Sequence, residues 1–209
     1  LITPLRNPAL LAKTSATIDS ISRGRLELGV GMGWQEEEYL TAGVPFEKRA
    51  EIFWETLEIC QLLWRESPAS YNGNIYQFDD IWCQPQPVQG ADLPLLFGLK
   101  MTASNAQKIA QIGHGWIPIK TDEEFISSGS ELLSKAFKEN NKDDTPRIRG
   151  QLPTQLDDSG VPNLELTLKQ AEKSIASGLT EIEIFPINFV RSKDDIVPVL
   201  KTISELTNL

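Results

Sequence analysis

Residues 6–39, RNPALLAKTSATIDSISRGRLELGVGMGWQEEEY, contain one amphipathic helix followed by one short buried strand and a glycine-rich loop. Proline suits the first helical turn, so the helix is expected over residues 8–22, with Leu11 and Ile18 near one face. Residues 25–30 are apolar, short and bounded by glycine, as is typical of a strand buried on both faces. This stretch therefore predicts a helix that leads into a strand of a parallel sheet.

The same alternation continues along the chain. Further strands are predicted at residues 93–98, 116–119, 147–152 and 181–187, and further helices at 46–65, 102–112, 122–138, 164–177 and from 192 onward. Asp122 is expected to cap one of these helices, and Ser192 with Asp195 to begin the last one. The helix at 164–177 has an apolar stripe of Leu164, Leu168, Ala171 and Ile175. Five strand-helix units in succession favour a parallel α/β sheet. On the pattern alone, a doubly wound sheet and a barrel both remain open.

One segment departs from the alternation. Residues 68–89 contain Asn72-Gly73 between aromatic side chains, which indicates a small hairpin, and then a segment interrupted by prolines. A length of 209 residues suits one globular domain. We therefore expect a single domain over residues 1–209, with residues 68–89 as a hairpin excursion.

Composition excludes several classes of partner. The chain has 29 acidic and 20 basic residues, and the basic ones are scattered, which argues against a nucleic acid partner. No apolar run approaches the length that spans a bilayer, and no export signal is visible, so no membrane partner is expected. Cys60 and Cys83 form neither a disulfide framework nor a zinc spacing, which favours reduced cysteines and a cytoplasmic location.

The run Gly29-Val30-Gly31-Met32-Gly33 invites comparison with the dinucleotide-binding fingerprint. The match fails in detail, because Trp34 stands where a third glycine is required and the next strong helix is expected only near residue 46. A dehydrogenase of the Rossmann type is therefore the least favoured reading. Taken alone, the glycines would only permit a tight turn.

Titratable side chains give no catalytic constellation. His114 is the only histidine and lacks a partner in the sequence that would orient it, so a surface turn is its expected place. Glu36, Glu37 and Glu38 fit a solvated loop or a first helical turn. No nucleophile with an adjacent base is visible.

The stretch at 6–39, together with VPFEKRAEIFWETLEICQLLW, NGNIYQF, QPQPVQ, LPLLFG and IAQIGHGWIPI, resembles the luciferase-like oxidoreductase family. The resemblance covers roughly residues 3–119. The rest of the chain resembles the family only in the order of its predicted strands and helices. GVGMGW followed by an acidic run looks most like the branch that uses the deazaflavin coenzyme F420 rather than FMN.

The resemblance implies a TIM-type (β/α)8 barrel with reduced FMN or coenzyme F420 at the carboxyl ends of the strands, where active sites of such barrels lie. A complete barrel has about 250 residues. A chain of 209 residues that opens on a strand-like stub at Leu1 fits an incomplete barrel without its first two strand-helix units. We therefore expect a missing N-terminus.

The resemblance also implies eight cofactor-binding residues at three strand ends: Thr3 and Pro4, then Gly31 and Gly33, then Gly98, Leu99, Lys100 and Thr102. Glycines would let the backbone approach the cofactor, and the helix that follows the loop GLKMT would face its phosphate. This loop departs from the family pattern in two ways. Leu99 replaces a glycine, and the hydroxyl residue expected at the cofactor phosphate is Thr102 or Ser104 rather than the residue directly after Lys100.

The implied function is hydride transfer or monooxygenation of a small organic substrate, with the chemistry carried by the cofactor. We expect a small-molecule partner, a homo-oligomer such as a dimer, and no metal. The alternative is a non-catalytic barrel remnant that serves as a scaffold or dimerisation module.

Overall fold

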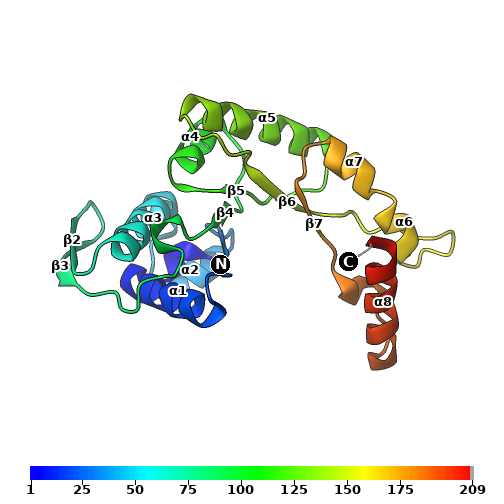
Figure 1. Cartoon of the computed structure of the whole chain (residues 1–209), viewed down its shortest axis with the longest axis horizontal. Helices are drawn as coiled ribbons and strands as arrows, with labels where there is room; N and C mark the ends of the chain where they lie inside the picture. The colour runs from blue at the N-terminus through cyan, green and yellow to red at the C-terminus, as the bar shows by residue number, and fades with distance from the viewer. Residues whose placement is uncertain (208–209) are drawn as a thin grey trace. The chain divides into compact units, whose positions relative to one another are not determined.

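The computed structural model describes residues 1–207 and divides into two compact units, Leu1–Leu99 and the part from Lys100 onward (Figure 1). Each unit contains parallel strands and helices that cover them, so the α/β class is confirmed. The expectation of one domain stays a prediction.

The sheet of the first unit joins two predicted strands in parallel. β1 (Leu28–Val30) pairs with β4 (Leu95–Phe97), and all three residues of β4 are buried. Ile2 forms a parallel bridge with Gly31, which confirms the strand-like character of the opening residues. Both strands are shorter than predicted, but their places in the chain are confirmed.

The helices α1 (Pro8–Ser22) and α3 (Arg49–Arg65) pack side by side in this unit (Figure 1). α3 follows a 3-10 turn, η2 (Phe46–Lys48), at the predicted start. Ala12, Ser15 and Ala16 are buried on α1, whereas Ile18 is 45% exposed. Small side chains are needed there because α3 comes close: the Trp64 indole donates to the Ala12 carbonyl over 3.0 Å.

The glycine-rich loop contains a short helix, α2 (Glu36–Ala42), where the sequence predicted a loop or a first turn. Its three leading glutamates interact favourably with the helix N-terminus. Gly43 ends it in the left-handed conformation with φ 69°. Tyr39 is its buried residue, and the tyrosine ring meets Phe46 edge-on at 5.1 Å.

The predicted hairpin is confirmed as an antiparallel pair, β2 (Ala69–Asn72) with β3 (Gln77–Ile81), beside α3 (Figure 1). The turn is fastened to α3 by Glu55, whose carboxylate accepts hydrogen bonds from the amides of Ile75 and Tyr76 at 3.0 and 2.7 Å. A 3-10 turn, η3 (Gly90–Asp92), then leads into β4.

The second unit holds three parallel strands in chain order: β5 (Gly115–Trp116), β6 (Arg147–Gln151) and β7 (Glu181–Glu183). The helices α4 (Ala103–Ile112) and α5 (Glu123–Glu139) pack on each other. Asp122 caps α5 as predicted, accepting from the Phe125 amide at 2.8 Å. A Cβ on Gly129 would lie 2.3 Å from the Trp116 ring, so glycine lets α5 press on β5.

The segment from 164 onward differs from prediction. The helix predicted at 164–177 is broken into α6 (Leu164–Leu168) and α7 (Ala171–Ala176). The strand predicted at 181–187 ends at Glu183, because proline begins the 3-10 turn η4 (Pro186–Phe189).

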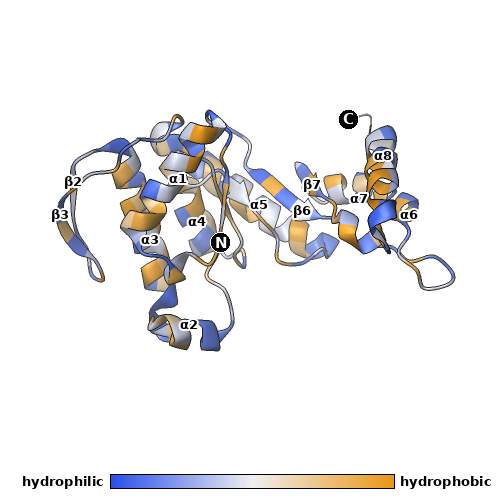
Figure 2. Ribbon diagram, turned by 90° about the horizontal axis from the view of Figure 1, so that it is seen from below, coloured by the Kyte–Doolittle hydropathy of each residue, from blue (hydrophilic) through white to orange (hydrophobic). Residues whose placement is uncertain are grey.

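The last helix begins with the predicted capping box of Ser192 and Asp195. The 3-10 turn η5 (Lys193–Asp195) leads into α8 (Ile196–Thr207), which Figure 2 shows with both hydrophobic and hydrophilic residues.

Three features bear on chemistry within residues 1–207. No helix there has the length and apolarity to cross a bilayer, and no three potential ligands gather to hold a metal ion. Cys60 and Cys83 are buried free thiols. Burial raises the pKa of Cys60, the Cys83 thiol adding to that effect, so this cysteine is unsuited to act as a thiolate nucleophile.

Candidate active site

Three parallel segments of the first unit end at one edge: the opening residues, β1 and β4. The Thr3 amide donates to the Gly31 carbonyl at 2.9 Å, and the Gly98 amide donates to the Val30 carbonyl at 2.8 Å. Carboxyl ends of parallel strands are where α/β proteins place their ligands. This edge therefore gathers the strand-end residues that the sequence singled out.

Gly31 and Gly98 form the closest approach at this edge. A Cβ on Gly31 would lie 3.2 Å from the Gly98 carbonyl oxygen, tighter than ordinary contact, whereas a Cβ on Gly98 would meet only the Val30 carbonyl at 3.6 Å. Both glycines are partly exposed. The edge thus presents bare backbone, against which a flat ligand could lie without meeting a side chain.

Gly33 turns the chain away from the strand. Its φ is +69°, a conformation that residues with a Cβ rarely adopt, and an added Cβ would lie 3.1 Å from the Ile2 side chain. Glycine is therefore required both by the turn and by the contact with the opening strand.

Thr3 and Pro4 are buried beside these glycines, in the 3-10 turn η1 (Thr3–Leu5). The Thr3 hydroxyl oxygen has no hydrogen-bond partner among residues 1–207. A buried hydroxyl without a partner costs free energy, so a polar atom of a ligand near Thr3 would be stabilising. The orphaned hydroxyl and the bare glycines both fit a polar, flat cofactor.

The remaining predicted residues lie on the loop GLKMT. Leu99 is 4% exposed and is one of the buried hydrophobic core residues. In the second unit, Thr102 caps α4: its hydroxyl oxygen accepts from the Asn105 amide at 3.1 Å, and the Asn105 side chain donates to the Lys100 carbonyl at 2.9 Å. The start of α4 is thereby ordered, with Lys100 and Thr102 exposed, and its first amides and the lysine can together attract an anion.

A groove of about 470 Å³ adjoins this loop within the second unit. Lys100, Lys120 and Phe125 are among its lining residues, and the Lys120 ammonium lies 5.6 Å from the Phe125 ring centroid. Lys120 could not be predicted from the sequence, because it is a single charge on a loop and its place follows from the packing of α5.

His114 and the acidic run at 36–38 belong to different units of the chain. The His114 carbonyl accepts from the Arg147 amide at 3.0 Å at the start of β5, so the residue lies at a strand end. Glu36, Glu37 and Glu38 are exposed in the first turn of α2, as one of the two readings predicted.

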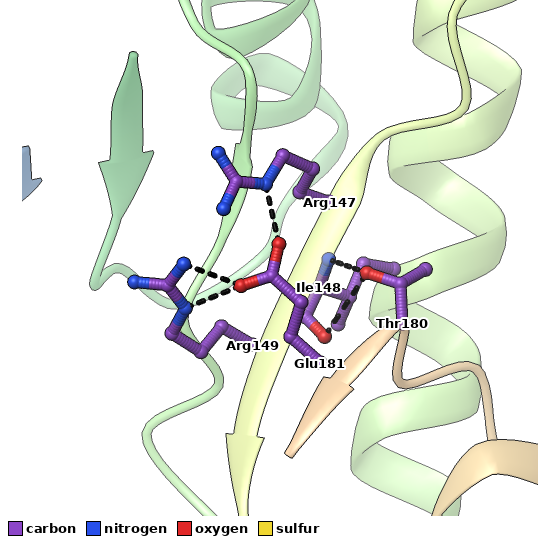
Figure 3. A network of polar contacts seen from close by, with 5 residues as sticks. All are labelled: Arg147, Ile148, Arg149, Thr180 and Glu181. Carbon is purple, nitrogen blue, oxygen red and sulfur yellow. Dashed lines mark hydrogen bonds and ion pairs between the residues drawn. The ribbon is translucent and has the colours of Figure 1, made fainter. Parts of the chain in front are cut away.

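A charged network occupies one face of β6 and β7 in the second unit. Figure 3 shows the Glu181 carboxylate between Arg147 and Arg149, with an ion pair to each. Partial burial raises the pKa of Glu181, but the hydrogen bonds and charges of the two arginines outweigh it and hold this pKa below its usual value. Faces of parallel strands are usually apolar, so a charged network on this face could not be predicted from the strand pattern.

A profile of the family described as luciferase-like monooxygenase matches residues 1–161. An uncharacterized protein of Mycobacterium tuberculosis is 36% identical over 142 residues, which cover 68% of this chain and 50% of that protein. The chain thus spans about half the length of the curated relatives it matches.

Solved structures share the fold at low identity. An F420-dependent secondary alcohol dehydrogenase in complex with an F420-acetone adduct superposes with a TM-score of 0.79 and 16% identity, over 96% of this chain and 75% of that chain. The oxygenating constituent of 3,6-diketocamphane monooxygenase of Pseudomonas putida, in complex with FMN, superposes with a TM-score of 0.61 and 17% identity, over 75% and 47%.

Proposed function

Because the chain belongs to the luciferase-like monooxygenase family, we propose that it is part of an oxidoreductase that uses reduced FMN or coenzyme F420 on a small organic substrate. The observation that supports this proposal most is the sheet edge where Thr3, Gly31 and Gly98 meet. This edge has exposed backbone at the two glycines and a buried Thr3 hydroxyl without a hydrogen-bond partner among the described residues. The complexes of structural neighbours with F420 and with FMN support the two cofactors.

We propose that these strands belong to a TIM-type (β/α)8 barrel, which the fold likeness supports. The expected lack of the first two strand-helix units stays a prediction. We also propose a cytoplasmic location, which the two free cysteines support, and a homodimer.

In this proposal the chain binds and orients rather than transferring protons. When bound, the cofactor supplies hydride transfer or the activation of dioxygen. In the first unit, Gly31, Gly33 and Gly98 would let the backbone approach the ring, the Thr3 hydroxyl would pair with a polar ring atom, and Pro4 would fix the turn beside it. In the second unit, Lys100, Thr102 and the start of α4 would hold a phosphate group. Leu99, the last residue of the first unit, is buried in the core.

Titration with FMN and with F420, followed by absorbance and cofactor fluorescence, tests the proposal. We expect saturable binding of at least one cofactor and weaker binding by Thr102→Val, which removes the hydroxyl but keeps the shape. Thr41→Val is the control for the loss of an exposed threonine hydroxyl. Thr41 lies in α2, and its hydroxyl donates to the Glu37 carbonyl.

Failure to bind either cofactor at near-millimolar concentration would refute the enzyme proposal. It would favour the non-catalytic scaffold instead. If a cofactor binds, its reduced form should be oxidised faster when a suitable ketone or dioxygen is added, and its oxidised form should be reduced when a suitable alcohol is added.

A further inference from the structure

Trp34 is the most exposed of the large apolar side chains in the part of the chain that the structure describes, at 84%. Trp64 and Trp116 are at most 1% exposed, and Trp82 is 58% exposed. An indole can bury about 200 Å² of surface. In the first unit most of the Trp34 indole is exposed to solvent, and the residue directly follows Gly33 in the chain.

The backbone around Trp34 is held in place. Gly33 packs on Ile2, since a Cβ added to Gly33 would lie 3.1 Å from the Ile2 side chain. The hydroxyl of buried Tyr39 donates to the Met32 carbonyl. The indole is therefore presented by an anchored segment rather than by a free loop. Little conformational entropy of the backbone would be lost when a ligand contacts it.

The surrounding charge narrows the ligand chemistry. Glu36, Glu37 and Glu38 follow within four residues and are exposed, so a phosphate or another anion would be repelled here. A flat aromatic ring suits an indole, because aromatic rings attract one another when they stack with an offset. The surface around Trp34 therefore suits the ring system of a bound cofactor and not its phosphate.

We propose that Trp34 stacks on the ring system of the bound flavin or deazaflavin and sets how tightly the ring is held. This inference rests on the proposed function, since it requires that a cofactor binds at the edge formed by Thr3, Gly31 and Gly98. It makes Trp34 a binding residue outside the eight that the sequence predicted.

The test is the Kd for FMN and for F420 in the wild-type chain and in Trp34→Leu, Trp34→Phe and Trp82→Leu. An aromatic pair contributes about 0.5–1.5 kcal/mol, so Trp34→Leu should bind roughly 2- to 12-fold more weakly. Trp34→Phe should recover most of the affinity, because it keeps a ring. Trp82→Leu removes a second exposed indole and should leave the Kd unchanged.

Tryptophan emission provides a readout that is independent of activity. Quenching on cofactor addition should be largest in the wild-type chain and in Trp82→Leu, and smaller in Trp34→Phe and Trp34→Leu. Circular dichroism should show unchanged folding in all variants, since neither indole is in the core.

The outcomes separate the two claims. If a cofactor binds and Trp34→Leu keeps the wild-type Kd, the stacking role is wrong while the proposed function stands. If the wild-type chain binds neither cofactor, the proposed function and the stacking role both fall.

Discussion

Replacing Glu181 by Gln should destabilise the second unit, because this one carboxylate pairs with two arginines. The change keeps the size of the side chain but leaves Arg147 and Arg149 without their shared countercharge. Their side chains are 31% and 24% exposed, and that of Glu181 is 27% exposed. The network thus lies between a surface pair and a buried one.

The expected magnitude follows from that intermediate burial. Breaking a buried pair costs about 3–5 kcal/mol, and an exposed pair contributes about 0–1 kcal/mol. We therefore expect Glu181→Gln to lower the free energy of unfolding by about 2 kcal/mol at pH 7. Glu165→Gln is the control, because its pair with Lys169 is mostly exposed and its removal should have a much smaller effect.

The effect should depend on pH with a definite sign. The pKa of Glu181 is lower in the folded chain than its usual 4.5, so the carboxylate contributes its full stability above about pH 4.5. That contribution is lost as the pH falls through the folded pKa. Wild type and Glu181→Gln should therefore converge in stability in acid.

Urea unfolding followed by circular dichroism gives the free energies, and hydrogen exchange locates the change. The amides of Ile148 and Thr180, which bond across β6 and β7, should exchange faster in Glu181→Gln. A loss below about 0.5 kcal/mol at pH 7, typical of a surface pair, would refute the reasoning. So would a loss that stays constant down to pH 3.

Three further predictions concern the first unit. Asp19→Ala should lower the free energy of unfolding by about 3 kcal/mol, measured in urea, because the buried carboxylate accepts from the Gln89 amide, the Gln89 side chain and the Leu26 amide; a loss below a third of this would contradict that role. Gly31→Ala should lower the Tm and weaken cofactor binding, since its Cβ would press on a carbonyl at 3.2 Å, and an unchanged Tm would count against the close approach. Cys60 should react with a thiol reagent only after unfolding, because burial raises its pKa and the side chain is 0% exposed; rapid labelling of the native chain would contradict this.

Local signals in the sequence predicted the elements they control. Asp122, and the pair Ser192 and Asp195, were recognisable as caps because a cap depends on residues only three positions away. Gly113 likewise ends α4 where predicted. Such positions need no knowledge of the tertiary structure.

Errors arose where distant contacts override a periodic pattern. Ile175 fits a helical stripe with Leu164 and Leu168, yet it is 57% exposed, while Thr167 is buried. The Thr167 hydroxyl accepts from the Gln155 amide at 2.9 Å, a partner twelve residues away. Periodicity could not show that this segment packs through a hydroxyl rather than through its aliphatic side chains.

The candidate site was predictable in its backbone but not in its side chains. Glycines at strand ends pointed to Gly31, Gly33 and Gly98 through the family resemblance. The exposure of Trp34 could not be predicted, because it depends on how Tyr39 and Ile2 hold the loop.

The attachment of the hairpin to α3 has a consequence for protein engineering. The turn is ordered by Glu55, which belongs to the helix, and a Cβ on Gly73 would lie 2.3 Å from the Glu55 carboxylate. A transplanted copy of residues 69–81 should therefore lose its turn in another protein unless a carboxylate is supplied beneath it. Ser70 should also be kept, because its hydroxyl oxygen accepts from the Asp80 amide at 3.0 Å across the two strands.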